Sequence, residues 1–292
     1  MNRLLLILAF VVAFPFIGNA QRKRAFMVGI SNYHTNGYKV WNNIHGAEDV
    51  ALLKPELEKK GFKVQTLINE QATYQGILNA LNPFIATSKK GDVVYLHFSC
   101  HGQPVEDGLN GLAKDEKDGW DEAIVPIDAG KEYNSAYKGE KHLTDDELND
   151  YIGKLRMKIG PKGMLYVAMD ACHAGESSKG GLETERGTKD GLTKTGKPYI
   201  PPMTNIKHFK ITQSPLMAPA LFIEACKSFQ WNTEVRIKGK EYGSLSYNIW
   251  QALMGMPTLD KGSKEKFKTL IEASTKIKGR WHSLTQDLVF EE

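Results

Sequence analysis

The sequence predicts an α/β fold built around a largely parallel sheet. Short apolar segments with strand character alternate along the chain with segments whose apolar residues recur at helical spacing. Strands that alternate with helices in this way are typical of parallel β-α-β units. The pattern shows no internal repeat, and strand and helix resume after one long polar stretch. We therefore expect a single domain with one large insertion.

Each expected element has a local signal. Strands are expected at residues 25–30, 62–68, 92–98, 164–169 and 220–224, and helices at 46–60, 73–88, 144–155 and 245–254. The first helix carries apolar residues at helical spacing and stops before Gly61. The third begins at Thr144, which is followed three residues later by Glu147, the spacing of a capping box.

Two stretches lack such signals. Residues 102–142 are rich in Gly, Asp and Lys and predict mainly loop. Residues 175–205 are crowded with Gly, Lys, Thr and Pro, which predicts a mobile insertion. We expect this insertion to lie inside one domain that spans residues 21–292.

The first twenty residues are expected to be a signal peptide. Residues 1–3 form a short positive start, residues 4–17 are apolar, and small residues precede the end of the segment at Ala20. The apolar part is shorter than the roughly 20 residues needed to span a bilayer, so no stable membrane anchor is expected. Cleavage after Ala20 would give a secreted or periplasmic protein that begins at Gln21.

Composition limits the class of protein. Of the 292 residues, 41% are hydrophobic and 25% are charged, which are ordinary globular values. The formal charge of +4 is spread along the chain, so no nucleic-acid partner is expected. Three cysteines are too few for a disulfide scaffold and cannot all pair within the chain. At least one is therefore expected to be a free thiol, and the oligomeric state stays undetermined.

Reactive side chains follow two of the expected strands. The strand at 92–98 leads into Ser99, His101 and Gly102, and the strand at 164–169 leads into Asp170 and Cys172. Ligand crevices of doubly wound sheets lie beyond the carboxyl ends of the strands. A thiol becomes a good nucleophile when an imidazole takes its proton. The backbone N–H groups of Gly102 and Cys172 are candidate donors to an oxyanion.

These residues also carry a family resemblance. Tyr95–Gly102 resembles the strand ending in Ser-x-His-Gly of metacaspases, and Asp170–Gly175 resembles their Asp-x-Cys-His-Ser-Gly block. Further similar segments are residues 28–33, 46–49, 118–128, 144–148, 224–226 and 242–247. The chain is thus similar, over about residues 25–255, to caspase–metacaspase cysteine peptidases, as an exported bacterial member.

The resemblance implies a three-layer α/β/α sandwich of the caspase type and peptide hydrolysis through a thioester acyl-enzyme. By matching positions, Cys172 would be the nucleophile, His101 the general base and Gly102 part of the oxyanion hole. Asp170 and Ser99 match positions that line the pocket for the residue before the scissile bond. In metacaspases this pocket is acidic and accepts Arg or Lys. The family's further acidic residue has no counterpart here in residues 31–45.

No cofactor is expected for the chemistry, although many metacaspases need calcium. Asp115, Asp118, Asp145 and Asp146 are the candidate oxygen ligands of such an ion. Lys179 stands at the position of a further family ligand, which leaves the set incomplete.

Two other function classes fit parts of the sequence. One is a catalytically silent caspase-like module that binds a peptide or protein. The other is a zinc site drawn from residues 97, 100, 101, 172 and 173, which lack the usual spacing of ligand pairs. If specificity is basic, the Arg and Lys residues of the 175–205 insertion also make it a candidate for self-processing.

Overall fold

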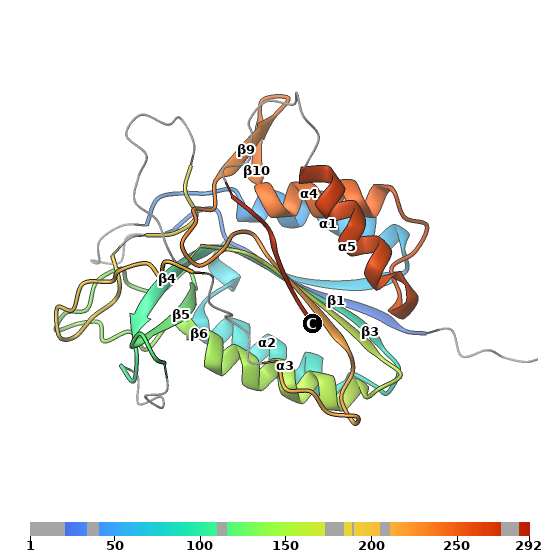
Figure 1. The fold of residues 1–292 in the computed structure, drawn as a ribbon, viewed down its shortest axis with the longest axis horizontal. Coiled ribbons are helices and arrows are strands. Elements are labelled where there is room, and N and C mark those ends of the chain that lie inside the picture. Colours follow the sequence, from blue (N-terminus) through green and yellow to red (C-terminus); the bar gives the residue numbers. More distant parts are fainter. Residues whose placement is uncertain are drawn as a thin grey trace, which may run out of the picture.

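A central six-stranded sheet organises the protein. The structure, a computed structural model, describes residues 21–33, 41–109, 116–172, 184–188, 190–204, 211–275 and 286–292. The strands of the central sheet are β1 (Lys23–Gly29), β2 (Phe62–Ile68), β3 (Val93–Ser99), β7 (Met164–Asp170), β8 (Ala220–Glu224) and β11 (Val289–Glu291). Their spatial order is β11-β8-β7-β3-β1-β2, and Figure 1 shows the sheet between two layers of helices. Only β11 runs antiparallel to its neighbour, so the expected parallel sheet is confirmed.

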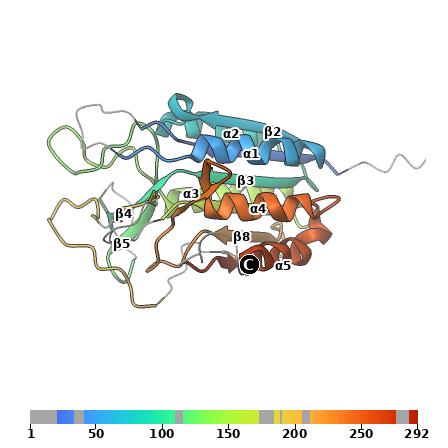
Figure 2. The same ribbon diagram turned by 90° about the horizontal axis from the view of Figure 1, so that it is seen from above.

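Helices cover both faces of this sheet. They are α1 (Gly46–Lys59), α2 (Tyr74–Ala86), α3 (Asp145–Ile159), α4 (Ser244–Met254) and α5 (Lys264–Thr275), with short 3₁₀ turns at Asn69–Gln71 and Lys261–Ser263. Helices α1, α4 and α5 lie on one face, side by side in Figure 2, while α2 and α3 lie on the other. The expected three-layer α/β/α sandwich is therefore confirmed.

Burial on both faces explains the composition of the central strands. Every residue of β3 and β7 is buried, because each strand packs against a helical layer above and below. Two apolar clusters result, one under each helical layer. Thr144 caps α3 as its spacing predicts, since its Oγ1 accepts a hydrogen bond from the Glu147 N–H at 3.4 Å.

Residues 102–142 differ from the loop that composition predicts. They contain β4 (His101–Glu106) and β5 (Trp120–Val125), which form a small antiparallel sheet with β6 (Leu143–Thr144). Pro104 and the charged pair Asp121 and Glu122 hide the apolar alternation by which strands are recognised. The hairpin of β9 (Glu234–Ile237) and β10 (Lys240–Gly243), with α5 and β11, was also not predicted.

The insertion at 175–205 differs in part from its prediction. Residues 173–183, 189 and 205 lie outside the described residues, as does the expected signal peptide at 1–20. Within the described part, however, Arg186 and Leu192 are fully buried against the rest of the domain. In the ranges that the structure describes, no helix combines the length and apolarity needed to cross a bilayer.

Candidate functional site

The structure brings the predicted Cys–His pair to one edge of the sheet. Strands β3 and β7 are parallel neighbours, and their register sets Ser99 opposite Asp170. His101 and Cys172 each lie two residues beyond these positions. Both are buried, with 2% of their surfaces exposed.

The His101 ring is held by two aromatic rings and one backbone carbonyl. Its centroid lies 5.0 Å from the stacked ring of Trp41 and 4.9 Å from that of Tyr33. Nε2 is 2.7 Å from the Asn42 carbonyl, which only accepts, so Nε2 carries the proton in a neutral ring. Nδ1 is buried and makes no hydrogen bond of normal geometry within the described residues. Burial lowers the pKa of His101 to about 4, which leaves Nδ1 with a free lone pair at neutral pH.

The Cys172 thiol contacts a second cysteine. Cys172 Sγ donates a hydrogen bond to the Gln230 carbonyl at 3.2 Å and accepts one from Cys226 Sγ at 3.5 Å. The hydrogen bond to Cys172, together with burial, raises the pKa of Cys226 well above its ordinary value. The third thiol, Cys100, is also buried, and burial raises its pKa to about 12.

The carbonyl oxygen of Arg186 occupies the expected oxyanion position. It accepts hydrogen bonds from Gly102 N at 3.1 Å and from Cys172 N at 3.2 Å. Gly187, the next residue, lies directly against Cys172. A Cβ at Gly187 would lie 3.2 Å from Cys172 Cβ and 2.3 Å from the Cys172 carbonyl oxygen. The Arg186–Gly187 peptide bond thus lies beside the predicted nucleophile.

Residues 184–186, which precede this bond, pair with residues 232–234 in the way that an added β-strand does. Arg186 N donates to Asn232 O at 3.1 Å, and Glu234 N donates to Thr184 O at 3.0 Å. These bonds make an antiparallel bridge between Glu185 and Thr233. Extended peptides bind at sheet edges through the same backbone pairing.

The residues after the bond run along β4. Gln103 Nε2 donates to Asp190 O at 2.8 Å, and Leu192 N donates to Pro104 O at 2.8 Å. Glu106 N returns a hydrogen bond to Leu192 O at 2.9 Å. The insertion therefore crosses the site on both sides of Arg186–Gly187, in the manner of a bound peptide.

The Arg186 side chain fills an acidic pocket and is fully buried. Its Nη2 lies 2.7 Å from Asp49 Oδ2 and 2.7 Å from Glu234 Oε1. Nη1 donates to Ser99 Oγ at 2.5 Å and lies 3.6 Å from Asp170 Oδ1. The predicted pocket residues Ser99 and Asp170 thus meet there, joined by two carboxylates to which the sequence assigned no role.

The pocket holds three carboxylates around one guanidinium. Burial raises the pKa of Asp49 to about 7, against the opposing effect of Arg186. Burial also acts to raise the pKa of Asp170, but Arg186 and hydrogen bonds from Asn232 and Ser246 outweigh it and hold that pKa below its ordinary value. An excess of buried negative charge is costly, so Asp49 is the member that takes up a proton near neutral pH.

Glycine at position 243 lets the pocket close around the guanidinium. A Cβ there would lie 2.1 Å from Asp170 Oδ2 and 2.7 Å from Arg186 Cζ. Its backbone N–H also donates to Asp49 Oδ1 at 2.9 Å. Any side chain at Gly243 would therefore displace either the carboxylate or the bound arginine.

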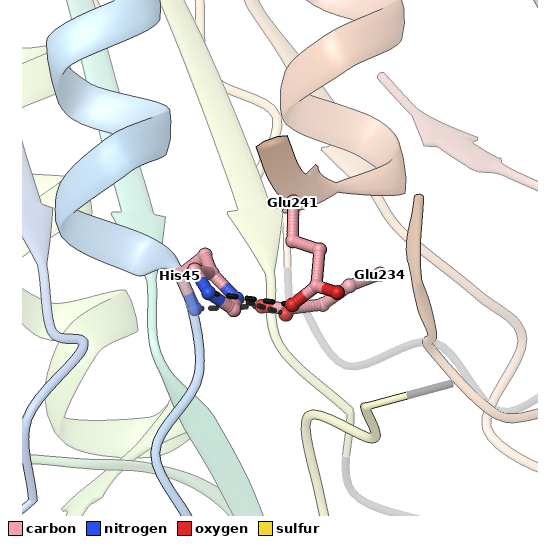
Figure 3. A group of neighbouring side chains, drawn as sticks. All are labelled: His45, Glu234 and Glu241. Atoms are coloured by element: carbon pink, nitrogen blue, oxygen red, sulfur yellow. Dashed lines mark hydrogen bonds and ion pairs between the residues drawn. The ribbon is translucent and has the colours of Figure 1, made fainter. Parts of the chain in front are cut away.

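His45 fixes the position of Glu234. Its backbone N–H donates to Glu234 Oε1 at 2.7 Å, and its Nδ1 lies 2.5 Å from Glu234 Oε2 (Figure 3). Nε2 lies 3.4 Å from Glu241 Oε2. Partial burial lowers the pKa of His45, but the Glu234 hydrogen bond and the nearby carboxylates outweigh it and raise the pKa.

These three side chains are close enough to bind a metal ion, with ligand atoms within 4.8 Å of one another. The two carboxylates, however, approach different ring nitrogens of His45, and Glu234 Oε1 already binds Arg186. An ion-pair network that supports the pocket explains this arrangement without a metal.

A second acidic cluster lies between β5 and the start of α3. Carboxylate oxygens of Glu116, Asp145 and Asp146 lie within 4.8 Å of one another. Asp121 is 1% exposed, and neither of its carboxylate oxygens has a hydrogen-bond partner among the described residues. Burial, followed by the charges of neighbouring acidic residues, raises the pKa of Asp121 to about 7. Such a set of oxygens fits a hard cation such as calcium.

The calcium candidates of the sequence are only partly gathered there. Asp145 and Asp146 belong to the cluster, whereas Asp118 Oδ1 accepts a turn hydrogen bond from Trp120 N at 3.1 Å. Asp115 and Lys179 lie outside the described residues.

The zinc alternative gains no support from the described residues. His97 is hydrogen-bonded on both nitrogens, to Tyr95 Oη at 3.1 Å and Ser246 Oγ at 3.2 Å. His97, His101 and the cysteines form no group of three metal ligands within the described ranges, and His173 lies outside them.

Comparisons with known proteins agree with this geometry. The caspase domain family matches residues 22–273. Metacaspase-1 of Schizosaccharomyces pombe is 24% identical over 281 residues, covering 82% of this chain and 61% of its own length. Metacaspase-1A of Neurospora crassa is 28% identical over 171 residues, covering 56% and 34%. The chain thus spans less than two thirds of either relative.

Solved structures show the same fold. Protein GSU0716 from Geobacter sulfurreducens superposes with a TM-score of 0.62 at 21% identity, over 92% of both chains. Caspase-1 from Spodoptera frugiperda superposes with a TM-score of 0.53 at 13% identity, over 93% of this chain and 86% of its own. The family match over most of the chain, on a sheet of this topology, leads to one conclusion: the chain belongs to the caspase domain family of cysteine peptidases.

Proposed function

We propose that this chain is a cysteine endopeptidase that hydrolyses peptide bonds after Arg or Lys through a Cys172–His101 dyad. One observation carries the proposal. Arg186 lies with its guanidinium buried among Asp49, Asp170 and Glu234 and with its carbonyl on two backbone N–H groups. This is the arrangement that a substrate needs for attack at the carbonyl carbon.

The residues supply each step of the reaction. His101 Nδ1 accepts the thiol proton of Cys172, and the thiolate attacks the substrate carbonyl to form a tetrahedral oxyanion. Gly102 N and Cys172 N stabilise that oxyanion. Collapse of the intermediate breaks the C–N bond, His101 returns the proton to the leaving amine, and a thioester remains. Water activated by His101 then hydrolyses the thioester and regenerates the thiol.

The pocket favours arginine over lysine. The guanidinium binds through Nε, Nη1 and Nη2 to groups on three sides of the pocket. A lysine ammonium is a compact charge that cannot make this planar, forked set of contacts. We therefore expect both residues to be accepted before the scissile bond, with arginine preferred.

Fluorogenic peptides that differ only in the last residue test this proposal. The chain from Gln21, where the mature protein is expected to begin, should hydrolyse peptides ending in Arg, then Lys, and not those ending in Asp or norleucine. Failure of the folded, reduced protein to cleave any peptide, together with retained peptide binding, would favour the silent binding module instead.

Calcium binding is a separate part of the proposal. Glu116, Asp145 and Asp146, with the unpartnered carboxylate of Asp121 nearby, would hold the ion, which would neutralise buried negative charge. The peptide assay is therefore run with calcium and with a chelator. Thermal unfolding supplies a second readout, because an ion bound only by the folded state raises the unfolding temperature. An unfolding temperature that calcium leaves unchanged would count against this part alone.

Self-cleavage is expected at the Arg186–Gly187 bond. The bond lies beside Cys172, and its carbonyl accepts both oxyanion-hole hydrogen bonds. Incubation of the chain from Gln21 should give fragments 21–186 and 187–292, and amino-terminal sequencing of the second should begin at Gly187. Dilution should leave the first-order rate unchanged, because the bound segment belongs to the same molecule.

Matched variants test the position of the cut. Arg186→Gln removes the charge that fills the pocket and should abolish cleavage at this bond. Lys194→Gln changes an exposed basic residue of the same insertion and should leave cleavage intact. If Arg186→Gln is cut at the unchanged rate, or if the active parent chain stays whole, the segment is not a substrate.

A further inference from the structure

The nucleophile candidate Cys172 has a second thiol within reach. Cys172 follows β7 and Cys226 follows β8, and these strands are parallel neighbours in the central sheet. The backbone holds the two ends together, since Ala225 N donates to Met169 O at 3.1 Å. The two sulfurs lie 3.5 Å apart, and both cysteines are buried.

The approach of these sulfurs is close for residues that are not bonded. A disulfide has an S–S distance of about 2.05 Å, and it requires side chains that point toward each other from neighbouring positions. The hydrogen bond from Cys226 Sγ to Cys172 Sγ meets that requirement, because it directs the two side chains toward each other. Rotation of the side chains about their Cα–Cβ bonds changes the S–S distance without breaking the strand pairing.

We propose that Cys172 and Cys226 form a reversible disulfide that switches the enzyme off and protects its nucleophile from oxidation beyond the disulfide stage. The oxidant is a low-molecular-weight disulfide of the glutathione class. Cys172 thiolate attacks one sulfur of the oxidant and expels a first small thiol, which leaves a mixed disulfide on Cys172. Cys226 attacks the Cys172 sulfur and expels a second small thiol, which takes up the proton. Two protein thiols are oxidised, and one small disulfide is reduced to two thiols.

The pair would protect Cys172 from irreversible oxidation if the protein is exported, as its first twenty residues predict. A peroxide oxidises a lone thiolate to sulfenic acid and is itself reduced to water, and further peroxide carries the sulfur to irreversible sulfinic and sulfonic acids. A partner thiol at 3.5 Å attacks the sulfenic acid, which forms the S–S bond and releases water, and a thiol reductant then restores both thiols. Cys100 has no such role, since it follows β3 and its thiol contacts neither of the other two in the described structure.

A small disulfide reaches this pair through the substrate site. The bound segment at Arg186–Gly187 covers Cys172, so its departure exposes that thiol. The pocket that Cys226 lines with Met169 and Ala171 has only about 30 Å³ of accessible space, which is too small for such an oxidant. We therefore expect oxidation to be slow while the segment is bound and faster in chains that have been cleaved and have released it.

Peptide mapping after equilibration with glutathione and its disulfide tests the proposal. Free thiols are trapped with iodoacetamide under denaturing conditions. The expected product is one linked pair of peptides that contain Cys172 and Cys226, two hydrogens lighter than the reduced pair, with Cys100 alkylated. Peptidase activity should fall in proportion to the linked fraction and return with dithiothreitol.

A matched variant separates the pair from ordinary thiol oxidation. In Cys226→Ser, Cys172 should stop at the mixed disulfide with glutathione, whereas Cys100→Ser should still form the linked pair. Alkylation of both Cys172 and Cys226 in the parent chain at every redox ratio would overturn the proposal. A mixed disulfide on Cys172 that persists equally in the parent and in Cys226→Ser would do the same. Because the mass readout requires no turnover, failure of the proposed peptidase activity and failure of the disulfide are distinguishable.

Discussion

Replacing Cys172 by alanine is expected to lower kcat/KM for Arg-ending peptides by at least about 10⁴-fold. The variant loses the thiol two residues beyond β7, beside the two N–H groups that hold the Arg186 carbonyl. What remains is substrate binding and oxyanion stabilisation, which act without a nucleophile. His101→Ala should cost nearly as much, and the double variant little more, because the two side chains act as a unit.

Cys100→Ala is the matched control for this experiment. Cys100 is as deeply buried as Cys172 and precedes His101 in the chain. Its backbone N–H donates to Asp170 O at 3.4 Å, and alanine keeps this hydrogen bond. Activity should survive this change. A Cys172→Ala protein that retains activity within tenfold of the parent would exclude the dyad as the source of hydrolysis, provided that trace parent enzyme is excluded by mass spectrometry.

The fold could be predicted from the sequence where local patterns are strong. Strand β8 was predicted with its bounds, and Thr144 begins α3 through the cap that its spacing indicates. Strands β4 and β5 were missed, because their pairing satisfies backbone groups in a segment that lacks apolar alternation. Tertiary pairing, not local propensity, makes these residues strands.

The candidate site likewise contains residues that the sequence predicts and residues that it does not. His101, Cys172, Ser99 and Asp170 follow long buried strands, and parallel strands in register bring such positions together. Glu234 lies on a hairpin that has no sequence signal, and Arg186 lies in a segment whose composition predicts a loop. Their place in the pocket depends on contacts between segments far apart in the chain, which no single-sequence pattern contains.

Asp49 shows how the structure changes the expected pocket. The family's additional acidic residue is absent from residues 31–45, which suggested a weaker pocket for basic side chains. The structure instead supplies Asp49 from the first turn of α1 and Glu234 from β9. With Asp170, the pocket has more negative charge than one guanidinium balances, so its affinity for arginine depends on the protonation of Asp49.

Asp49→Asn is expected to cost about twofold or less in kcat/KM at pH 7 and below, where Asp49 keeps its proton, and up to about 100-fold for Arg-ending peptides at pH 9. The loss at pH 9 corresponds to about 2.7 kcal/mol, near the lower end for a buried charge that loses its partner. The asparagine Oδ1 still accepts from Gly243 N, but the position facing Arg186 Nη2 loses its negative charge. Glu241→Gln is the control, since Glu241 pairs with His45 on the outer side of the network and should change kcat/KM by less than about threefold.

The pH dependence of binding distinguishes this electrostatic role from a structural one. The pKa of Asp49 is about 7 with an arginine in the pocket, and it must be higher without that positive charge. Binding of a cation therefore releases a proton, so affinity is flat below about pH 7 and rises above it by up to tenfold per pH unit. Benzamidine, which stays cationic throughout this range, measures the affinity in an Arg186→Gln background whose own arginine no longer competes. Asp49→Asn should abolish the rise while the unfolding temperature shows that the fold is retained. A rise that persists in Asp49→Asn would assign the titration to another group and leave Asp49 a structural residue.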